Sequence, residues 1–418
     1  MSLHEDMVQI GEQALKASRE LVEFNSRKKN AILQSMADEL EAHRDDIAAA
    51  NELDMKAARE AGLDAAMQDR LLLTPARINS MIASLRDVAA LKDPVGDKIS
   101  RWLRPNGLEI IKQRVPIGVI GIIYESRPNV TLDTGGLCLK TSNAVILRGG
   151  KEARHSNAII ADLMIEGGRK KGLPDHAVQL IRTTDREAVR ELVQLKDYVD
   201  LVIPRGGEAL IKAVSEQAHV PVIKHYKGVC HTYIDASADL EMALAIVINA
   251  KCQRPGVCNA METLLVHRDV AQEFLPQLAT VAADKDVELR GDSAAREIVP
   301  EMVPADESDW YAEYLSLILS VKVVDSVEEA VEHINTYGSR HSDAIVAQSE
   351  SAQKTFAQAV DSSAVYINAS TRFTDGAEFG MGAEIGISTD KIHARGPMGL
   401  EELTTYKYVV YGKGQIRE

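Results

Sequence analysis

The chain has 418 residues, 45% of them hydrophobic, and a formal net charge of −14. This length is too great for one ordinary core and predicts two or three domains, while the negative charge argues against nonspecific binding to nucleic acid. Four cysteines are too few for a disulfide framework, and Cys252 and Cys258 have no second pair at metal-ligand spacing, which argues against a zinc site. The N-terminus lacks a secretion signal and no apolar run approaches the ~18 residues of a membrane span, so we expect a cytoplasmic protein.

The first quarter of the chain predicts helices followed by a hairpin. Residues 4–91 are rich in Ala, Leu, Glu, Lys and Arg and contain a single proline, Pro75, which predicts successive helices over the next domain. In residues 99–114 two β-like runs flank Pro-Asn-Gly, a typical hairpin signal. Pairing with another subunit would cover the open edges of this hairpin; an ordinary surface hairpin is the alternative.

From residue 117 onward, apolar strand-like runs alternate with helix-like segments. Such alternation predicts parallel sheets with helices on both faces. The first group of predicted strands comprises residues 117–123, 144–147, 178–181 and 201–203. A second group comprises residues 230–234, 263–266 and 317–324. We therefore predict an α/β fold with two Rossmann-like parallel-sheet domains.

Two predicted strand ends carry glycines and cations, and ligands of open α/β sheets bind beyond such ends. The first combines Gly149 and Gly150 with three cations, Arg148, Lys151 and Arg154. A 2′-phosphate needs a cation, so this surplus favours NADP over NAD, although Glu152 leaves the choice open. A charged helix start on the surface is the alternative, and the G-x-G-x-x-G fingerprint is absent.

The second strand end places Arg205, Gly206 and Gly207 before a predicted helix. Helix N-termini offer free N–H groups and a positive dipole to phosphate. We therefore predict that both glycine-containing ends bind the cofactor.

Cys258 lies in Gln-Arg-Pro-Gly-Val-Cys-Asn-Ala-Met-Glu-Thr, residues 253–263, between a Pro-Gly turn and an apolar run. Arg254 places a cation nearby, and a cation or a cluster of N–H groups raises the thiolate fraction of a cysteine. From this pattern alone, a catalytic nucleophile and a buried core thiol are both open.

Longer strings resemble a known family. Residues 115–121, residues 141–148 and the Cys258 segment follow the order of the aldehyde dehydrogenase superfamily. Tyr-Glu-Ser-Arg-Pro-Asn-Val-Thr at 124–131 and Gln-Arg-Pro-Gly-Val-Cys-Asn-Ala-Met-Glu at 253–262 resemble its γ-glutamyl phosphate reductase branch, also called glutamate-5-semialdehyde dehydrogenase. The tail strings at 365–376 and 393–400 do so as well, and the resemblance reaches residue 417.

The resemblance implies an organisation in three parts. Residues 1–228 would hold the N-terminal helices and the NADP-binding domain, residues 229–362 the catalytic domain with the nucleophilic cysteine, and residues 363–418 a return to the cofactor domain and a last strand. That strand and the hairpin near 99–114 would form a small oligomerisation element of a homo-oligomer.

The resemblance also implies a reaction. The branch reduces L-glutamyl 5-phosphate with NADPH to L-glutamate 5-semialdehyde and phosphate, the second step from glutamate to proline. We expect handover of the acyl phosphate from a separate glutamate 5-kinase, because no kinase-like segment precedes residue 1. A CoA-acylating aldehyde dehydrogenase and a non-catalytic relative are the competing hypotheses.

The family assigns roles to residues of these strings. Cys258 would form a thioester, with its own N–H and Asn129 as oxyanion donors; Arg127 competes with Asn129 for the second place. Oxidising members use a glutamate that activates water, but the matching string, residues 225–229, has no carboxylate. This absence argues for reduction or phosphorolysis. For His225 we favour a substrate contact over a general-base role.

The remaining predictions concern charged residues and cysteines. Glu313 stands where the superfamily holds the nicotinamide ribose; a surface carboxylate is the alternative. The anionic substrate needs cations, and Arg254, Arg372 and Arg395 suit this task, although any of them could instead hold a loop. His341 has no assigned role. The other thiols, Cys138, Cys230 and Cys252, are expected to be packed, with a Cys252–Cys258 disulfide as a further hypothesis.

Overall fold

The computed structural model describes residues 2–224 and 227–417, with Ala66 described by its backbone only. Its contacts divide the chain into two compact units, each with its own sheet. The N-terminal unit comprises Met1–Lys224, Gly380–Gly386 and Met398–Glu418. The cysteine unit comprises His225–Phe379 and Ile387–Pro397.

The N-terminal unit begins with the predicted helices. They are α1 (Leu3–Leu21), α2 (Ser26–Ala42), α3 (Arg44–Glu60), α4 (Ala65–Leu71) and α5 (Pro75–Ala90). Side chains that precede the helices cap them: Ser2 forms a capping box with Glu5, and Thr74 accepts the Arg77 N–H before the N-terminal proline of α5. Helix α2 packs against α5 and α7, so this region covers the sheet domain as the sequence predicts.

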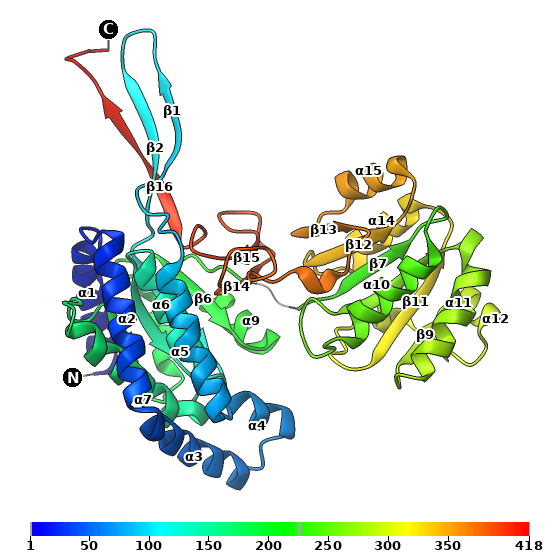
Figure 1. Ribbon diagram of the computed structural model, residues 1–418, viewed down its shortest axis with the longest axis horizontal. Coiled ribbons are helices and arrows are strands. Elements are labelled where there is room, and N and C mark those ends of the chain that lie inside the picture. Colours follow the sequence, from blue (N-terminus) through cyan, green and yellow to red (C-terminus); the bar gives the residue numbers. More distant parts are fainter. Residues whose placement is uncertain (1, 225–226, 418) are drawn as a thin grey trace. The chain divides into compact units, whose positions relative to one another are not determined.

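A four-stranded parallel sheet forms the core of this unit (Figure 1). Its strands are β3 (Val119–Tyr124), β4 (Ala144–Arg148), β5 (Val178–Leu180) and β6 (Leu201–Arg205), in the order β5-β4-β3-β6. The helices that join or follow them are α6 (Asn129–Lys140), α7 (Arg154–Arg169), α8 (Glu187–Gln194) and α9 (Glu208–Gln217). All residues of β3 and β4 are buried, which explains their continuous apolar runs.

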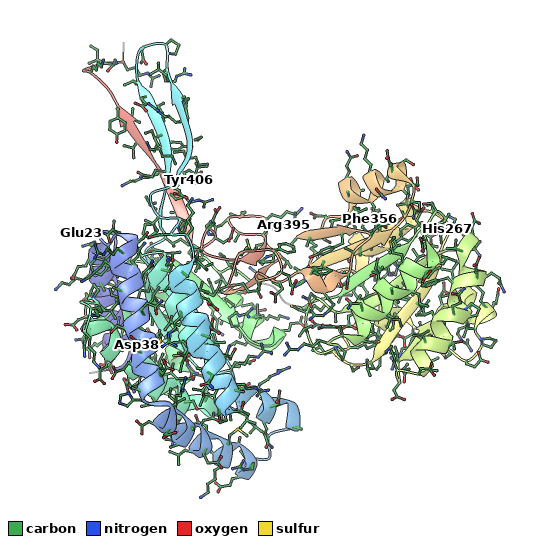
Figure 2. All side chains as sticks on the ribbon, in the orientation of Figure 1. Glu23, Asp38, His267, Phe356, Arg395 and Tyr406 are labelled. Atoms are coloured by element: carbon green, nitrogen blue, oxygen red, sulfur yellow. The ribbon has the colours of Figure 1, made fainter. Side chains whose placement is uncertain are left out.

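The predicted hairpin consists of β1 (Lys98–Leu103) and β2 (Glu109–Pro116), which pair antiparallel. The last strand, β16 (Thr404–Tyr411), pairs with β2 along its whole length, from Thr404 opposite Pro116 to Tyr411 opposite Glu109. The resulting three-stranded sheet, the β-arm, extends away from the helices of the unit (Figure 1), and Figure 2 labels Tyr406 on it. Every residue of β1 is exposed.

The cysteine unit contains a seven-stranded parallel sheet in the order β10-β9-β11-β8-β7-β12-β13. Its strands are β7 (Cys230–Ile234), β8 (Met261–His267), β9 (Glu288–Gly291), β10 (Val303–Pro304), β11 (Ile318–Val324), β12 (Ser342–Val346) and β13 (Ala364–Ile367). Its helices are α10 (Leu240–Cys252), α11 (Arg268–Ala283), α12 (Ser293–Ile298), α13 (Glu307–Trp310), α14 (Val327–Tyr337) and α15 (Glu350–Ala359).

Both faces of this sheet are buried. Successive residues of β8 point to opposite faces: Leu264 packs in a cluster with residues of α10 and α11, and Leu265 in a cluster with residues of α14 and α15. A short pair, β14 (Gly386–Ser388) and β15 (Gly396–Met398), completes the strands. The sequence thus predicted the α/β class and the parallel sheets correctly.

Two searches over the described residues were negative. None of the helices there has the length and apolar character that crossing a membrane requires. Within the same residues, no group of three or more His, Cys, Asp or Glu side chains is arranged to hold a metal ion.

Candidate active site

The carboxyl ends of β3, β4 and β6 form one edge of the sheet in the N-terminal unit, because these strands are parallel neighbours. The chain enters β6 on the far side of β3 from β4 and β5, so this edge includes a switch point, where open α/β sheets bind ligands. The strand ends and the loops that follow them carry six of the predicted site residues: Asn129, Arg148, Lys151, Arg205, Gly206 and Gly207.

Arg148 is buried within this edge and only 7% exposed. Its terminal nitrogens donate to the backbone carbonyls of Gly149 (2.6 Å), Thr184 (3.1 Å) and Asp185 (3.2 Å). Burial is also the main cause that lowers the pKa of its guanidinium. These carbonyls lie in the loops after β4 and β5, so Arg148 joins the two loops.

Lys151, Gly206 and Gly207 are exposed at the same edge, whereas Gly149 and Gly150 are half-buried. Lys151 begins the short helix η1 (Lys151–Ala153), and Gly207 is the N-cap of α9. The Gly207 N–H donates to Glu125 Oε2 at 2.8 Å, and a Cβ on Gly206 would lie 2.5 Å from the same oxygen. The Glu125 carboxylate therefore already accepts a hydrogen bond at the N-terminus of α9, where the helix dipole favours an anion.

Asn129 is the first residue of α6. Its side-chain Nδ2 donates to Asp133 Oδ2 one turn later at 2.9 Å, and Ser84 Oγ donates to the other oxygen of Asp133 at 3.3 Å. Burial raises the pKa of Asp133, while the Asn129 hydrogen bond and the charge of Arg205 act in the opposite direction. Since an amide nitrogen carries two hydrogens, one remains to donate elsewhere.

In the cysteine unit, residues 254–259 form the cysteine turn before β8. Cys258 is a partly exposed free thiol. The Val257 carbonyl accepts the Ala260 N–H at 3.1 Å, so the Cys258 N–H of the same trans peptide points the opposite way. In the described part of the chain, this N–H has no hydrogen-bond acceptor. It is therefore available to a substrate oxygen.

Two of the three predicted substrate cations surround this turn. Arg372 Nε donates to Gln253 Oε1 at 2.8 Å, and its terminal nitrogen donates to Asn259 Oδ1. Burial is the main cause that lowers the pKa of Arg372; the charge of Arg254 lowers it further, and that of Cys258 raises it. Arg254 belongs to the turn itself and Arg372 contacts Gln253 and Asn259, so both cations lie beside Cys258.

Glu313 is connected to the turn through Gly228. Its Oε1 accepts the Gly228 N–H at 2.7 Å, and a Cβ on Gly228 would clash with the backbone of Cys258. Next to Glu313, Leu315 adopts a left-handed φ of 54° and its N–H donates to Glu262 Oε1 at 3.2 Å. A left-handed bulky residue is strained and marks a functional segment.

Glu262 is fully buried and pairs with Lys251 (Nζ–Oε2, 2.5 Å). Burial raises the pKa of Glu262 to about 7, against the opposing effect of Lys251. Lys251 and Glu262 thus form an internal ion pair, and Glu262 also holds the backbone at Leu315.

The remaining predicted residues are placed differently. Arg395, labelled in Figure 2, donates to Asp361 Oδ1 at 2.7 Å, so its charge is paired with a carboxylate in the segment between α15 and β13. His225 lies outside the described residues. His341, whose role the sequence left open, lies under the cysteine turn, with Nδ1 3.7 Å from Cys230 Sγ.

Comparisons with known proteins identify the family. Residues 2–297 match the aldehyde dehydrogenase family. A Gamma-glutamyl phosphate reductase of Moorella thermoacetica is 57% identical over 408 residues, 98% of each chain, and one of Halothermothrix orenii is 54% identical over 418 residues, 100% of each chain. The crystal structure of a Gamma-glutamyl phosphate reductase from Thermotoga maritima is 48% identical, with a TM-score of 0.97, covering 99% of this chain and 100% of that one.

The chain belongs to the γ-glutamyl phosphate reductase branch of the aldehyde dehydrogenase family. The resemblance stated from the motif strings is thereby confirmed. Aldehyde dehydrogenases use NAD or NADP, so a nicotinamide cofactor follows from membership.

Sequence reasoning missed several residues that shape these sites. Glu125 and Glu262 both lie in the strings that carry the family resemblance, but their roles depend on partners distant in sequence. Gly228 lies in the string that lacks a carboxylate, and its need for glycine depends on Cys258, 30 residues later. Cys230 was predicted only as a packed strand residue; the structure adds a contact with the Cys258 carbonyl.

Proposed function

We propose that this enzyme reduces L-glutamyl 5-phosphate with NADPH to L-glutamate 5-semialdehyde and phosphate, through a thioester on Cys258. The observation that carries the proposal is the cysteine turn. It combines a partly exposed thiol, a Cys258 N–H that has no acceptor among the described residues, and the cations Arg254 and Arg372. The relatives at 52–57% identity are all named for reduction of γ-glutamyl phosphate.

In the first half-reaction, Cys258 Sγ attacks the acyl carbon of the substrate. The carbonyl oxygen gains negative charge and is stabilised by the Cys258 N–H and by the Asn129 side chain, with Arg127 as the competing donor. The C–O bond to the phosphate breaks, so a thioester and inorganic phosphate result. Asp133 holds one hydrogen of the Asn129 amide, which leaves the other for the oxyanion.

In the second half-reaction the thioester is reduced. A bound reduced nicotinamide supplies the hydride for this step. The tetrahedral species then releases the aldehyde and returns the Cys258 thiolate. Hydrolysis must be avoided, and the carboxylates near the turn do not serve it: Glu313 accepts the Gly228 N–H, and Glu262 is buried against Lys251.

For the cofactor, we propose NADP rather than NAD. The exposed Lys151 supplies a cation for the 2′-phosphate, and Arg205, Gly206 and Gly207 offer a strand end and a helix N-terminus to phosphate. The Glu125 carboxylate accepts the Gly207 N–H, so a cofactor phosphate at this helix end would have to displace it. Glu313 is proposed to hold the nicotinamide ribose.

For the substrate, Arg254 and Arg372 are proposed to bind its phosphate and carboxylate, with Arg395 and His225 as further contacts. Arg254 is exposed, so its guanidinium is the most available of these cations. Arg372 donates to Asn259 as well, which would link anion binding to the shape of the cysteine turn.

Partners and location follow from the same assignment. The β-arm exposes apolar residues, including Leu103 at 72% and Tyr408 at 56%, and we propose that it forms the interface of a homo-oligomer. We place the reaction in the cytoplasm, where free thiols such as those of the four cysteines stay reduced, and infer that a glutamate 5-kinase hands over the labile acyl phosphate.

The decisive experiment runs the reaction in reverse. Glutamate 5-semialdehyde is oxidised with NADP or NAD, in the presence of phosphate, CoA or neither. We expect turnover that requires phosphate and prefers NADP, loss of turnover in Cys258→Ala, and retention in the control Cys252→Ala. A requirement for CoA would indicate an acylating dehydrogenase, and near-normal turnover of Cys258→Ala would reject the mechanism.

A further inference from the structure

The cysteine turn is held from below by a second thiol. Cys230 Sγ lies 3.2 Å from the Cys258 carbonyl oxygen, in donor geometry. Cys230 is fully buried at the first position of β7, and the register between β7 and β8 shifts between Cys230 and His231. Such a bulge re-aims a side chain, which here contacts the peptide that follows Cys258.

The chemical state of Cys230 differs from that of a nucleophile. Burial is the main cause that raises the pKa of the Cys230 thiol well above its ordinary value, and the charges of Asp343 and Cys258 raise it further. The thiol therefore stays protonated and can donate its hydrogen to the Cys258 carbonyl. A buried carbonyl that loses its donor carries a desolvation cost.

A series of polar groups, buried except for the half-buried Tyr366, continues from Cys230. His341 Nδ1 lies 3.7 Å from Cys230 Sγ and 2.9 Å from Ser342 Oγ. Ser342 Oγ lies 2.6 Å from Thr374 Oγ1, which in turn lies 2.7 Å from the Tyr366 hydroxyl. The five groups come from β7, from β12 and the residue just before it, from β13, and from the segment after η2 (Thr371–Phe373).

This series of polar groups also contacts the cysteine turn at Asn259, the residue after Cys258. The Thr374 carbonyl accepts Asn259 Nδ2 at 2.9 Å, and Thr371 Oγ1 donates to the Asn259 carbonyl at 2.7 Å. The carbonyls of Cys258 and Asn259 are thus both held. The Cys258 N–H belongs to the preceding peptide, whose direction is set by the Val257 carbonyl that accepts the Ala260 N–H. The contacts at the Cys258 and Asn259 carbonyls fix the two peptides that follow, so the turn is held on both sides of the Cys258 Cα.

We propose that Cys230 is a positioning residue for the nucleophile: its buried thiol donates to the Cys258 carbonyl and, with His341, Ser342, Thr374 and Tyr366, fixes the turn so that the Cys258 N–H faces the substrate oxyanion. This inference rests on the proposed function for its kinetic readout. It assigns to Cys230 and His341 the role of positioning the cysteine turn, which could not be predicted from their residue types.

The test compares three variants of the full-length chain. Cys230→Ala removes the donor, Cys230→Ser restores one, and Thr232→Val is the matched control, because Thr232 is on the same strand with a buried hydroxyl that makes no hydrogen bond among the described residues. For Cys230→Ala we expect kcat about tenfold lower with KM for the semialdehyde nearly unchanged, since one unpaired buried acceptor disturbs the transition state and leaves the substrate cations in place. Cys230→Ser recovers most of kcat.

A second readout needs no substrate. Alkylation of Cys258 by iodoacetamide, followed by mass spectrometry, slows in Cys230→Ala, because a loosened turn keeps its N–H beside the thiolate for less of the time, and recovers in Cys230→Ser. If the wild type oxidises no semialdehyde, the proposed function fails while alkylation still tests Cys230.

Three results would overturn the inference: wild-type kcat and alkylation in Cys230→Ala, equal losses in the Ser and Ala variants, or the same loss in Thr232→Val. If Cys230→Ala does not fold, Tyr366→Phe interrupts the same series of polar groups at its half-buried end and is expected to lower kcat in the same way, with unchanged activity counting against the proposal.

Discussion

Gly228→Ala tests how tightly the cysteine turn is built. Gly228 is buried, and its N–H donates to Glu313 Oε1 at 2.7 Å. A Cβ at this position would lie 2.5 Å from the carbonyl carbon of Cys258 and 2.6 Å from its Cα, and would also meet its carbonyl oxygen. These neighbours are backbone atoms and cannot rotate away, so the turn itself must move.

The required displacement can be worked out. Ordinary contacts of a Cβ begin at 3.4 Å, so relief at the carbonyl carbon needs 3.4 − 2.5 = 0.9 Å of movement, and relief at the nearer carbonyl oxygen needs more. A misplacement of about 1 Å at a reacting group can cost about a hundredfold in rate. We therefore expect kcat for phosphate-dependent oxidation to fall about a hundredfold, because the thiol and its N–H move together.

The assay measures kcat and KM of Gly228→Ala beside Gly256→Ala. Gly256 lies in the same turn, but a Cβ there would meet only the Leu315 carbonyl, at 3.8 Å. We expect Gly256→Ala to keep near-normal kcat, and both proteins to show native circular dichroism. A Gly228→Ala enzyme with wild-type kcat would refute the claim that this glycine sets the position of Cys258.

Three further variants test other parts of the molecule. Lys151→Ala should raise the KM for NADPH about tenfold and leave the KM for NADH nearly unchanged, because one charged contact to the 2′-phosphate is lost. Lys171→Ala, at another exposed lysine, is the control. Equal effects on both cofactors would contradict the assignment of Lys151 to the 2′-phosphate. Burial lowers the pKa of His333 from 6.5 to about 2, so the unfolded chain takes up this proton first and stability falls as pH drops below 6.5, by roughly 1.4 kcal/mol per pH unit. His333→Phe should flatten this fall in thermal melts between pH 7 and 5, and an unchanged slope would count against it. Leu103→Asp in the β-arm should yield smaller particles by light scattering. Leu53→Asp, the control at another exposed leucine, should not. A wild-type protein that is already monomeric would reject the proposed interface.

The regular elements of the sheets were predictable from local pattern. The strand at 230–234 was predicted with its observed bounds, since a buried parallel strand is a continuous apolar or β-branched run. β12 was not predicted, because it begins with Ser342 and Asp343, both fully buried. Asp343 is tolerated there only because it accepts the His231 N–H at 2.8 Å and contacts His231 Nδ1 at 2.9 Å, and such a partner is 112 residues away.

The candidate site, like the fold, was only partly predictable from the sequence. Residue type and spacing along the chain pointed to Cys258, to the glycine and cation loops and to Arg254, because a Pro-Gly turn, paired glycines and clustered cations are local features. The sequence did not reveal that Arg148 turns inward to three carbonyls, or that Glu125 binds the N-terminus of α9. Those hydrogen bonds join different strand ends, which are neighbours only after the sheet has formed.

The sequence by itself determined the family and the alternation that builds two parallel sheets, and it predicted Cys258 as the nucleophile. Only the tertiary structure decided which groups support that nucleophile. It set Cys230 against the Cys258 carbonyl, required glycine at 228, and paired β16 with β2 across nearly 290 residues of chain. The physical reason is that hydrogen bonds and steric exclusion act between neighbours in space, and folding alone makes these residues neighbours.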